Sequence, residues 1–299
     1  MSSPARARAL AVAGALGALT LAACGSATTG QQAATPRPSA AAAAAQATQA
    51  AAGRNRFSAP ATVDNPMFPL VPGTEFSYAG TLSEGGHTRP HTVVFTVSSL
   101  TKKIHGVTTV IAWDRDFLGG KLQEQELAFF AQDDAGNVWN FGEYPEEYSR
   151  GKFTGAPSTW IRGTGHAYGG IHMLARPADG VSYREGLVPS IEFDDVSTVS
   201  RTGQTTCMHR RCYHQVLVVD ETSPNDPASG HQIKYYSPGV GLVRVGARGG
   251  DSQELLTLAG VRHLGQSAMA SVTREVIAMD RRAFDIRVYR VTGPAVQGW

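Results

Sequence analysis

Hydrophobic and polar residues alternate in short segments from about residue 66 onward, and turn-forming residues separate these segments. Within 91–100, for example, Val93, Phe95 and Val97 share one face, which is typical of a half-buried strand. The same pattern predicts strands at 74–81, 91–100, 107–116, 121–131, 138–143, 181–188, 195–202, 213–221, 231–237, 242–245 and 254–262. So many short strands predict a mainly β domain over 66–265, with one curved antiparallel sheet, an open or half β-barrel, that curls to bury its apolar face.

The period changes near the C-terminus. Met269, Val272, Val276 and Met279 recur every three or four positions, which predicts an amphipathic helix over 266–290, followed by a tail over 291–299. We expect this helix to cover the sheet or one open end of it, where it could act as a lid. Docking of the helix on a protein partner is the alternative, because the period says only that one face requires burial.

The N-terminal region has the opposite composition. Residues 24–65 are rich in Ala, Thr, Gln, Ser and Pro and poor in large apolar residues, so they predict a disordered tether with a reach of roughly 35 Å. Upstream, Arg6 and Arg8 precede an apolar run over 9–21 that is too short to span a bilayer, which predicts a signal peptide over 1–23.

The signal peptide ends in Leu21-Ala22-Ala23-Cys24, which resembles the lipobox of bacterial lipoproteins. The resemblance implies that Cys24 is diacylated and becomes the first residue of the mature chain. It therefore predicts a protein anchored in the cell membrane through a diacylglyceryl group on Cys24 and facing the extracytoplasmic side. An ordinary secretory signal followed by a chance cysteine is the alternative.

The charge balance narrows the choice of partners. Removing residues 1–23 takes away Arg6 and Arg8 and no acids, so the formal net charge falls from +2 to zero. A neutral chain without a clustered basic face argues against nucleic acid as a partner.

Cys24 accounts for one of the three cysteines, and the remaining pair is Cys207 and Cys212. Export favours a disulfide between them, which would stabilise the fold by roughly 2 kcal/mol. This requires a four-residue loop over 208–211, so that Cys207 faces Cys212. If residues 210–211 instead formed a two-residue turn, Cys207, His209, Cys212 and His214 would lie on one side of the hairpin as a zinc or copper site. Free thiols are the third alternative.

Other candidate chemistry is weaker. His166, His172 and Met173 lie in a Gly-rich loop and could bind copper, although a long surface connection explains the same residues. Glu124 and Glu126 alternate as on an exposed strand face, and Glu146 and Glu147 are typical of a polar loop. No nucleophile elbow, metalloprotease motif, Walker loop or dinucleotide fingerprint is present, so we expect neither catalysis nor a cofactor.

Several motifs resemble a family of exported bacterial β-rich proteins of unknown function. The motifs are 133–143, 235–243, Phe68-Pro69-Leu70 followed by Pro72-Gly73-Thr74, and Met173, Pro177, Gly180 and Tyr183 at their spacing. The family is similar to half-barrels such as the lipoprotein carrier LolA and the lipid-binding LppX, which implies a helix packed against the concave side. The resemblance implies no catalytic residues.

Together these patterns predict a non-catalytic, membrane-anchored binding protein that holds a hydrophobic ligand, a lipid or a lipidated partner on its concave face. The sequence assigns no ligand-binding residues. The alternatives are a surface adaptor with a solid core that acts through protein contacts, whose partner the sequence does not name, and a metal-binding lipoprotein.

Overall fold

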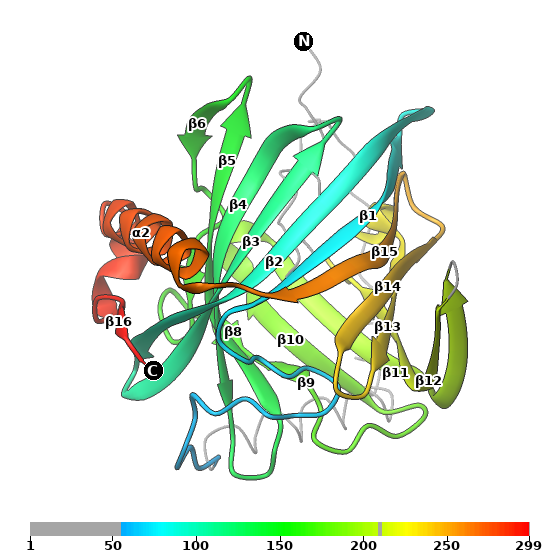
Figure 1. Ribbon diagram of the computed structural model, residues 1–299, viewed down its shortest axis with the longest axis horizontal. Helices are drawn as coiled ribbons and strands as arrows, with labels where there is room; N and C mark the ends of the chain where they lie inside the picture. Colours follow the sequence, from blue (N-terminus) through cyan, green and yellow to red (C-terminus); the bar gives the residue numbers. More distant parts are fainter. Residues whose placement is uncertain (1–54, 209–210, 299) are drawn as a thin grey trace, which may run out of the picture.

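A computed structural model describes residues 55–208 and 211–298 of the chain (Figure 1). The predicted signal peptide, Cys24 and the tether as far as residue 54 lie outside the described residues, as does His209.

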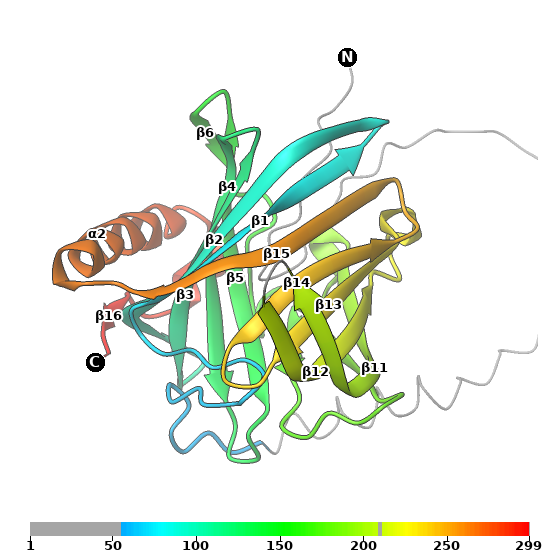
Figure 2. The same cartoon turned by 45° about the vertical axis from the view of Figure 1, so that its right-hand side comes forward.

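The described residues form one large antiparallel sheet that curls without closing into a barrel (Figure 2). Its strands follow the order β6-β5-β4-β3-β2-β1-β15-β14-β13-β12-β11-β10-β8. The long strands are β1 (Thr74–Glu84), β2 (His87–Ile104), β3 (Val107–Leu118), β4 (Lys121–Gln132), β5 (Val138–Ser149), β10 (Ser182–Val188), β11 (Phe193–Met208), β12 (Arg211–Thr222), β13 (His231–Ser237), β14 (Gly241–Arg248) and β15 (Ser252–His263). The mainly β fold class is therefore confirmed, and every predicted strand is present.

Short elements between β5 and β10 escaped the sequence pattern. They are β6 (Lys152–Gly155), β7 (Trp160–Ile161), β8 (Tyr168–Gly169) and β9 (Ile171–Met173), and the 3-10 turn Pro189–Ile191 follows β10. A segment of two or three residues is too short to display a period. The backbone of Gly170 links the two ends of the sheet, because its carbonyl accepts from Asn140 N (2.9 Å) and its N–H donates to Glu185 O (2.9 Å).

Helix α2 (Gln266–Ala283) lies on the convex side of the sheet, against β2 and β4 (Figure 1). It is shorter than the predicted 266–290, and the 3-10 turn Arg287–Val291 follows it. Tyr289 in that turn contacts Phe129, which lies on the opposite face of β4 from Phe130 and the interior. The expected lid, and the concave-side helix that the family resemblance implied, are therefore wrong. The outward faces of β4 and β5 carry the buried side chains of Phe129 and Tyr144, and Tyr289 of the turn packs against both.

The C-terminal tail also returns to the sheet. Its short strand β16 (Val296–Gln297) pairs with β2 at Thr101 and Leu100. A further 3-10 turn, Pro227–Ser229, connects β12 with β13. No helix in the described part of the chain combines the length and the hydrophobicity that a membrane span requires.

Part of the region predicted as tether over 24–65 packs against the sheet. Val63 and Asn65 are buried, and Asn65 Nδ2 donates to the carbonyl oxygens of Gly136 and Leu174. Phe57 packs edge-on against Phe141 at a centroid distance of 5.5 Å. These few apolar side chains in a polar segment cover one end of the curled sheet, so residues 55–65 belong to the domain.

Candidate functional site

Five carboxylates face the concave side of β3, β4 and β5. The strand register pairs Asp114 with Glu126, Asp116 with Glu124, and Ala128 with Glu143, so these acids share one face. That face is the inner one, because Phe130 belongs to it and contacts Phe68 and His172 inside the curled sheet. We call Asp114, Asp116, Glu124, Glu126 and Glu143 the acidic wall.

Burial makes the charge of the acidic wall costly. Glu126 and Glu143 are each 2% exposed. Burial raises the pKa of Glu126 well above its usual value, and the charge of Glu143 raises it further. Burial also raises the pKa of Glu143, although the side chain of Asn140 donates a hydrogen bond to it. The carboxylates of the wall therefore take up protons more readily than exposed carboxylates do.

His91 on β2 lies between two carboxylates at one end of this wall. Its Nε2 is 2.7 Å from Asp116 Oδ2 on β3, and its Nδ1 is 3.2 Å from Glu254 Oε1 on β15. One ligand atom from each of the three residues lies within 4.8 Å of the other two. The second oxygen of Glu254, Oε2, accepts a hydrogen bond from Gln232 Nε2 at 2.5 Å. The strands β2, β3 and β15 therefore bring three potential metal ligands together.

The electrostatics of this triad follow from burial and proximity. Burial alone would lower the pKa of His91, but the hydrogen bond and charge of Asp116 and the charge of Glu254 outweigh it, so the pKa is raised. Burial raises the pKa of Asp116 in spite of its hydrogen bond with His91. Burial also raises the pKa of Glu254 to about 7, against the opposing charge of His91.

The opposite wall of the interior contains its own counter-charges. Lys234 Nζ donates to Glu221 Oε2 at 2.6 Å, and His172 Nδ1 lies 2.9 Å from Glu185 Oε2. Burial would raise the pKa of Glu185, but the charges of His172 and Lys234 lower it to about 2. Glu221 and Glu185 therefore have cationic partners, whereas on the acidic wall Glu126 lies near the like charge of Glu143.

The other end of the interior is apolar and almost filled. A cavity of about 20 Å³ there is lined by aromatic and aliphatic side chains, among them Phe68, Phe76, Phe95 and Leu242. This volume has room for about one water molecule. In this conformation the apolar end has no space for an acyl chain.

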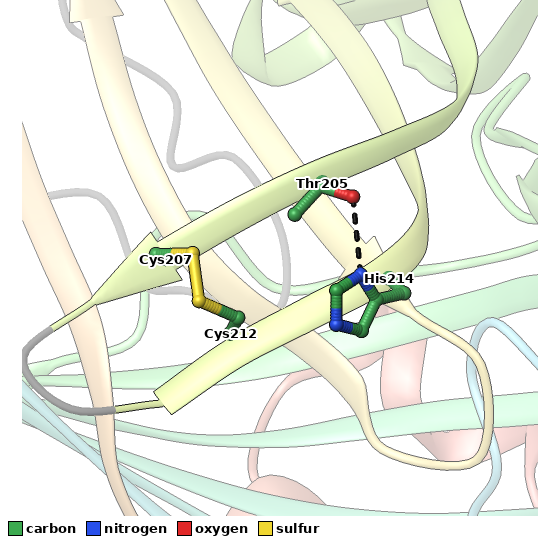
Figure 3. Close-up of a disulfide and its surroundings, with 4 residues drawn as sticks. All are labelled: Thr205, Cys207, Cys212 and His214. Atoms are coloured by element: carbon green, nitrogen blue, oxygen red, sulfur yellow. Dashed lines mark hydrogen bonds between the residues drawn. A yellow bond between two sulfur atoms is a disulfide. The ribbon is translucent and has the colours of Figure 1, made fainter.

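The cysteine hairpin is formed by β11 and β12, whose register places Cys207 opposite Cys212. A disulfide joins the two residues, and His214 Nδ1 lies 3.2 Å from Thr205 Oγ1 on the neighbouring strand (Figure 3). Because its sulfurs are bonded to each other, the hairpin offers no thiolate ligand in this redox state. His209, the remaining member of the predicted metal set, lies outside the described residues.

The predicted copper ligands of the Gly-rich loop have different surroundings. His172 is buried against Glu185, Met173 is buried in the core, and His166 is exposed. The pair Glu124 and Glu126 was expected on an exposed strand face, and the pair Glu146 and Glu147 in a polar loop. Both expectations are wrong for one member of each pair, because Glu126 and Glu146 are buried. Alternation along β4 was the available signal for the acidic wall, but it does not show which face of the strand points inward.

No protein-family model matches the chain, and no curated protein matches it. Two solved structures are similar to it. One is a protein described as exported, with a YmcC-like fold, from Bacteroides fragilis; it is 14% identical with a TM-score of 0.37, and the alignment covers 66% of this chain and 98% of that one. The other is a protein described as a lipoprotein from Parabacteroides distasonis; it is 13% identical with a TM-score of 0.30, and the alignment covers 66% of this chain and 99% of that one.

Proposed function

We propose that this protein is a non-catalytic, extracytoplasmic lipoprotein, anchored to the cell membrane through Cys24, that binds a small positively charged ligand at its acidic wall. The observation that carries the proposal is the group of five carboxylates on the concave faces of β3, β4 and β5, four of which are buried. A water-poor site rich in carboxylates gains from a cation, because buried charges of the same sign that lie close together are costly.

A hydrophobic ligand, expected from the sequence, has less support. Sites for drug-sized ligands usually have volumes of about 300–1,000 Å³, and the cavity at the apolar end has about 20 Å³. Helix α2 is also unable to act as a lid, because it lies on the convex side.

A surface adaptor that binds a protein partner is the second candidate. The filled apolar end favours it, because a solid core needs no ligand. The two candidates make different predictions for the acidic wall: an adaptor would tolerate neutral substitutions there without losing its partner, whereas a cation-binding protein would lose its ligand.

The test is native mass spectrometry of the full exported protein, purified in mild detergent, beside its Glu126→Gln and Glu143→Gln variants. We expect a small cationic adduct, inorganic or organic, that both variants retain less well. The variant Glu192→Gln, which changes an exposed carboxylate, is the matched control. A co-purifying lipid would revive the hydrophobic ligand and overturn the proposal, and a protein that carries no cation in any preparation would favour the adaptor.

A further inference from the structure

We infer that His91, Asp116 and Glu254 form a binding site for one divalent metal cation of the Zn²⁺ type. This inference deepens the proposed function and rests on it, since it names the cation and the residues that hold it.

Unpartnered atoms are the first reason for the inference. His91 Nδ1, Asp116 Oδ1 and Glu254 Oε1 are buried, and none of them has a hydrogen-bond partner among the described residues. His91 Nδ1 and Glu254 Oε1 face each other at 3.2 Å without the alignment of a hydrogen bond. Buried lone pairs normally have a donor, so a bound cation would complete an arrangement that side chains leave incomplete.

The spacing of the three residues also suits a metal. Their ligand atoms lie within 4.8 Å of one another. Around a tetrahedral ion with bonds of about 2.0–2.2 Å, ligand atoms are separated by about 3.3–3.6 Å. Side-chain movements of about 1 Å would therefore bring all three residues to one ion.

Neighbouring residues orient the ligands. Gln232 Nε2 holds Glu254 Oε2, which leaves Oε1 directed towards His91. His91 Nε2 and Asp116 Oδ2 already lie 2.7 Å apart, so an ion that took the place of their shared proton would bind both atoms. Glu254 Oε1 would then complete the site. A ring proton, if present, leaves to solvent when the metal binds.

The ligand set selects the class of metal. One imidazole nitrogen and two carboxylate oxygens suit Zn²⁺ and its first-row neighbours, whereas Ca²⁺ and Mg²⁺ prefer oxygen ligands alone. Glu124, which is paired directly with Asp116, is partly exposed, so this end of the acidic wall reaches solvent. The acidic wall would attract a cation towards this position.

The test is titration of the full exported protein, stripped of metal by a chelator, with ZnCl₂ in competition with a chromophoric chelator. We expect one Zn²⁺ per chain, weaker binding of MgCl₂ and CaCl₂, and at least a 100-fold loss of Zn²⁺ affinity in each of His91→Ala and Glu254→Gln. The matched control is His172→Gln, since His172 is also buried beside a carboxylate, and it should keep the wild-type affinity.

Binding of Co²⁺ in place of Zn²⁺ is measured on the wild-type protein, so the result does not depend on whether the variants fold. We expect visible bands typical of nitrogen and oxygen ligands, without a sulfur-to-cobalt charge-transfer band. A sulfur band would assign the metal to the Cys207 and Cys212 hairpin and overturn the inference. Absence of stoichiometric Zn²⁺ binding, or binding that neither variant weakens, would also overturn it.

The two proposals can fail separately. An organic cation in the native mass spectrum without Zn²⁺ binding would contradict the metal site and leave the proposed function standing. A protein that holds neither an organic cation nor a metal would contradict both.

Discussion

Lys102 Nζ on β2 lies 2.6 Å from Asp280 Oδ1 on α2, and both side chains are buried. Asp280 also accepts hydrogen bonds from Tyr289 OH at 2.7 Å and from Ala295 N at 2.9 Å. One carboxylate thus joins the helix, the following 3-10 turn and the C-terminal tail to the convex side of the sheet.

Removing one member of this pair should destabilise the domain strongly. We expect Lys102→Met to lower the free energy of unfolding by about 3–5 kcal/mol, because Asp280 would keep a buried charge without its cation. Urea unfolding followed by circular dichroism measures the change. Lys103→Met is the matched control, since Lys103 is the exposed neighbour on the same strand and should change stability by less than about 0.5 kcal/mol. Equal effects of the two variants would contradict a role for the pair.

The acidic wall should make stability depend on pH. The pKa of Glu126 is higher in the folded protein than the 4.5 expected for an unfolded chain, so above pH 4.5 the folded state binds more protons than the unfolded state. The free energy of unfolding therefore falls as the pH rises through this window. Glu126→Gln removes the titration, so we expect the variant to gain stability relative to wild type between pH 5 and pH 8, by about 1 kcal/mol or more.

Thermal unfolding at both pH values, with chelator present, measures this relative gain. Glu192→Gln is the control, because Glu192 is exposed. A Glu126→Gln variant whose stability differs from wild type equally at pH 5 and pH 8 would show that Glu126 does not titrate in this way.

The disulfide should stabilise the protein modestly. Replacing both Cys207 and Cys212 by Ser opens a loop with a sequence separation of 5, which should lower the free energy of unfolding by roughly 2 kcal/mol on the chain-entropy model. Denaturant unfolding with and without a reducing thiol measures this. The reductant should lower the free energy of unfolding of the wild type to that of the variant and leave the variant unchanged. A wild type whose free energy of unfolding does not change when this bond is reduced would contradict the expectation.

The membrane anchor is tested separately from the fold. Cys24→Ser should move the exported protein from the membrane fraction to the soluble fraction, because the acyl chains supply the attachment. Fractionation, with the mass of the N-terminal peptide, measures both the location and the lipid. The double variant Cys207→Ser/Cys212→Ser should stay in the membrane fraction. Retention of the Cys24→Ser variant in the membrane would point to a second attachment.

The sequence predicted the local structure well. Alternation of apolar and polar residues identified the long strands, and the three-four spacing identified the start of α2 at residue 266. The end of the helix was less predictable, because residues 287–291 keep apolar side chains in a 3-10 turn that contacts Phe129 through Tyr289. The short strands between β5 and β10 had no period to detect.

The candidate site was decided by tertiary structure. Alternation along β4 places Glu124 and Glu126 on one face, but either face of a curved sheet can be the concave one. The pairing of β1 with β15 brings Glu254 beside His91, and the sheet curls with Phe130 and Glu126 inside and Phe129 outside. The sequence by itself determined which side chains share a face, because this depends on the local backbone period. Only the curvature and the long-range strand pairing decided which face is buried, and therefore which carboxylates meet.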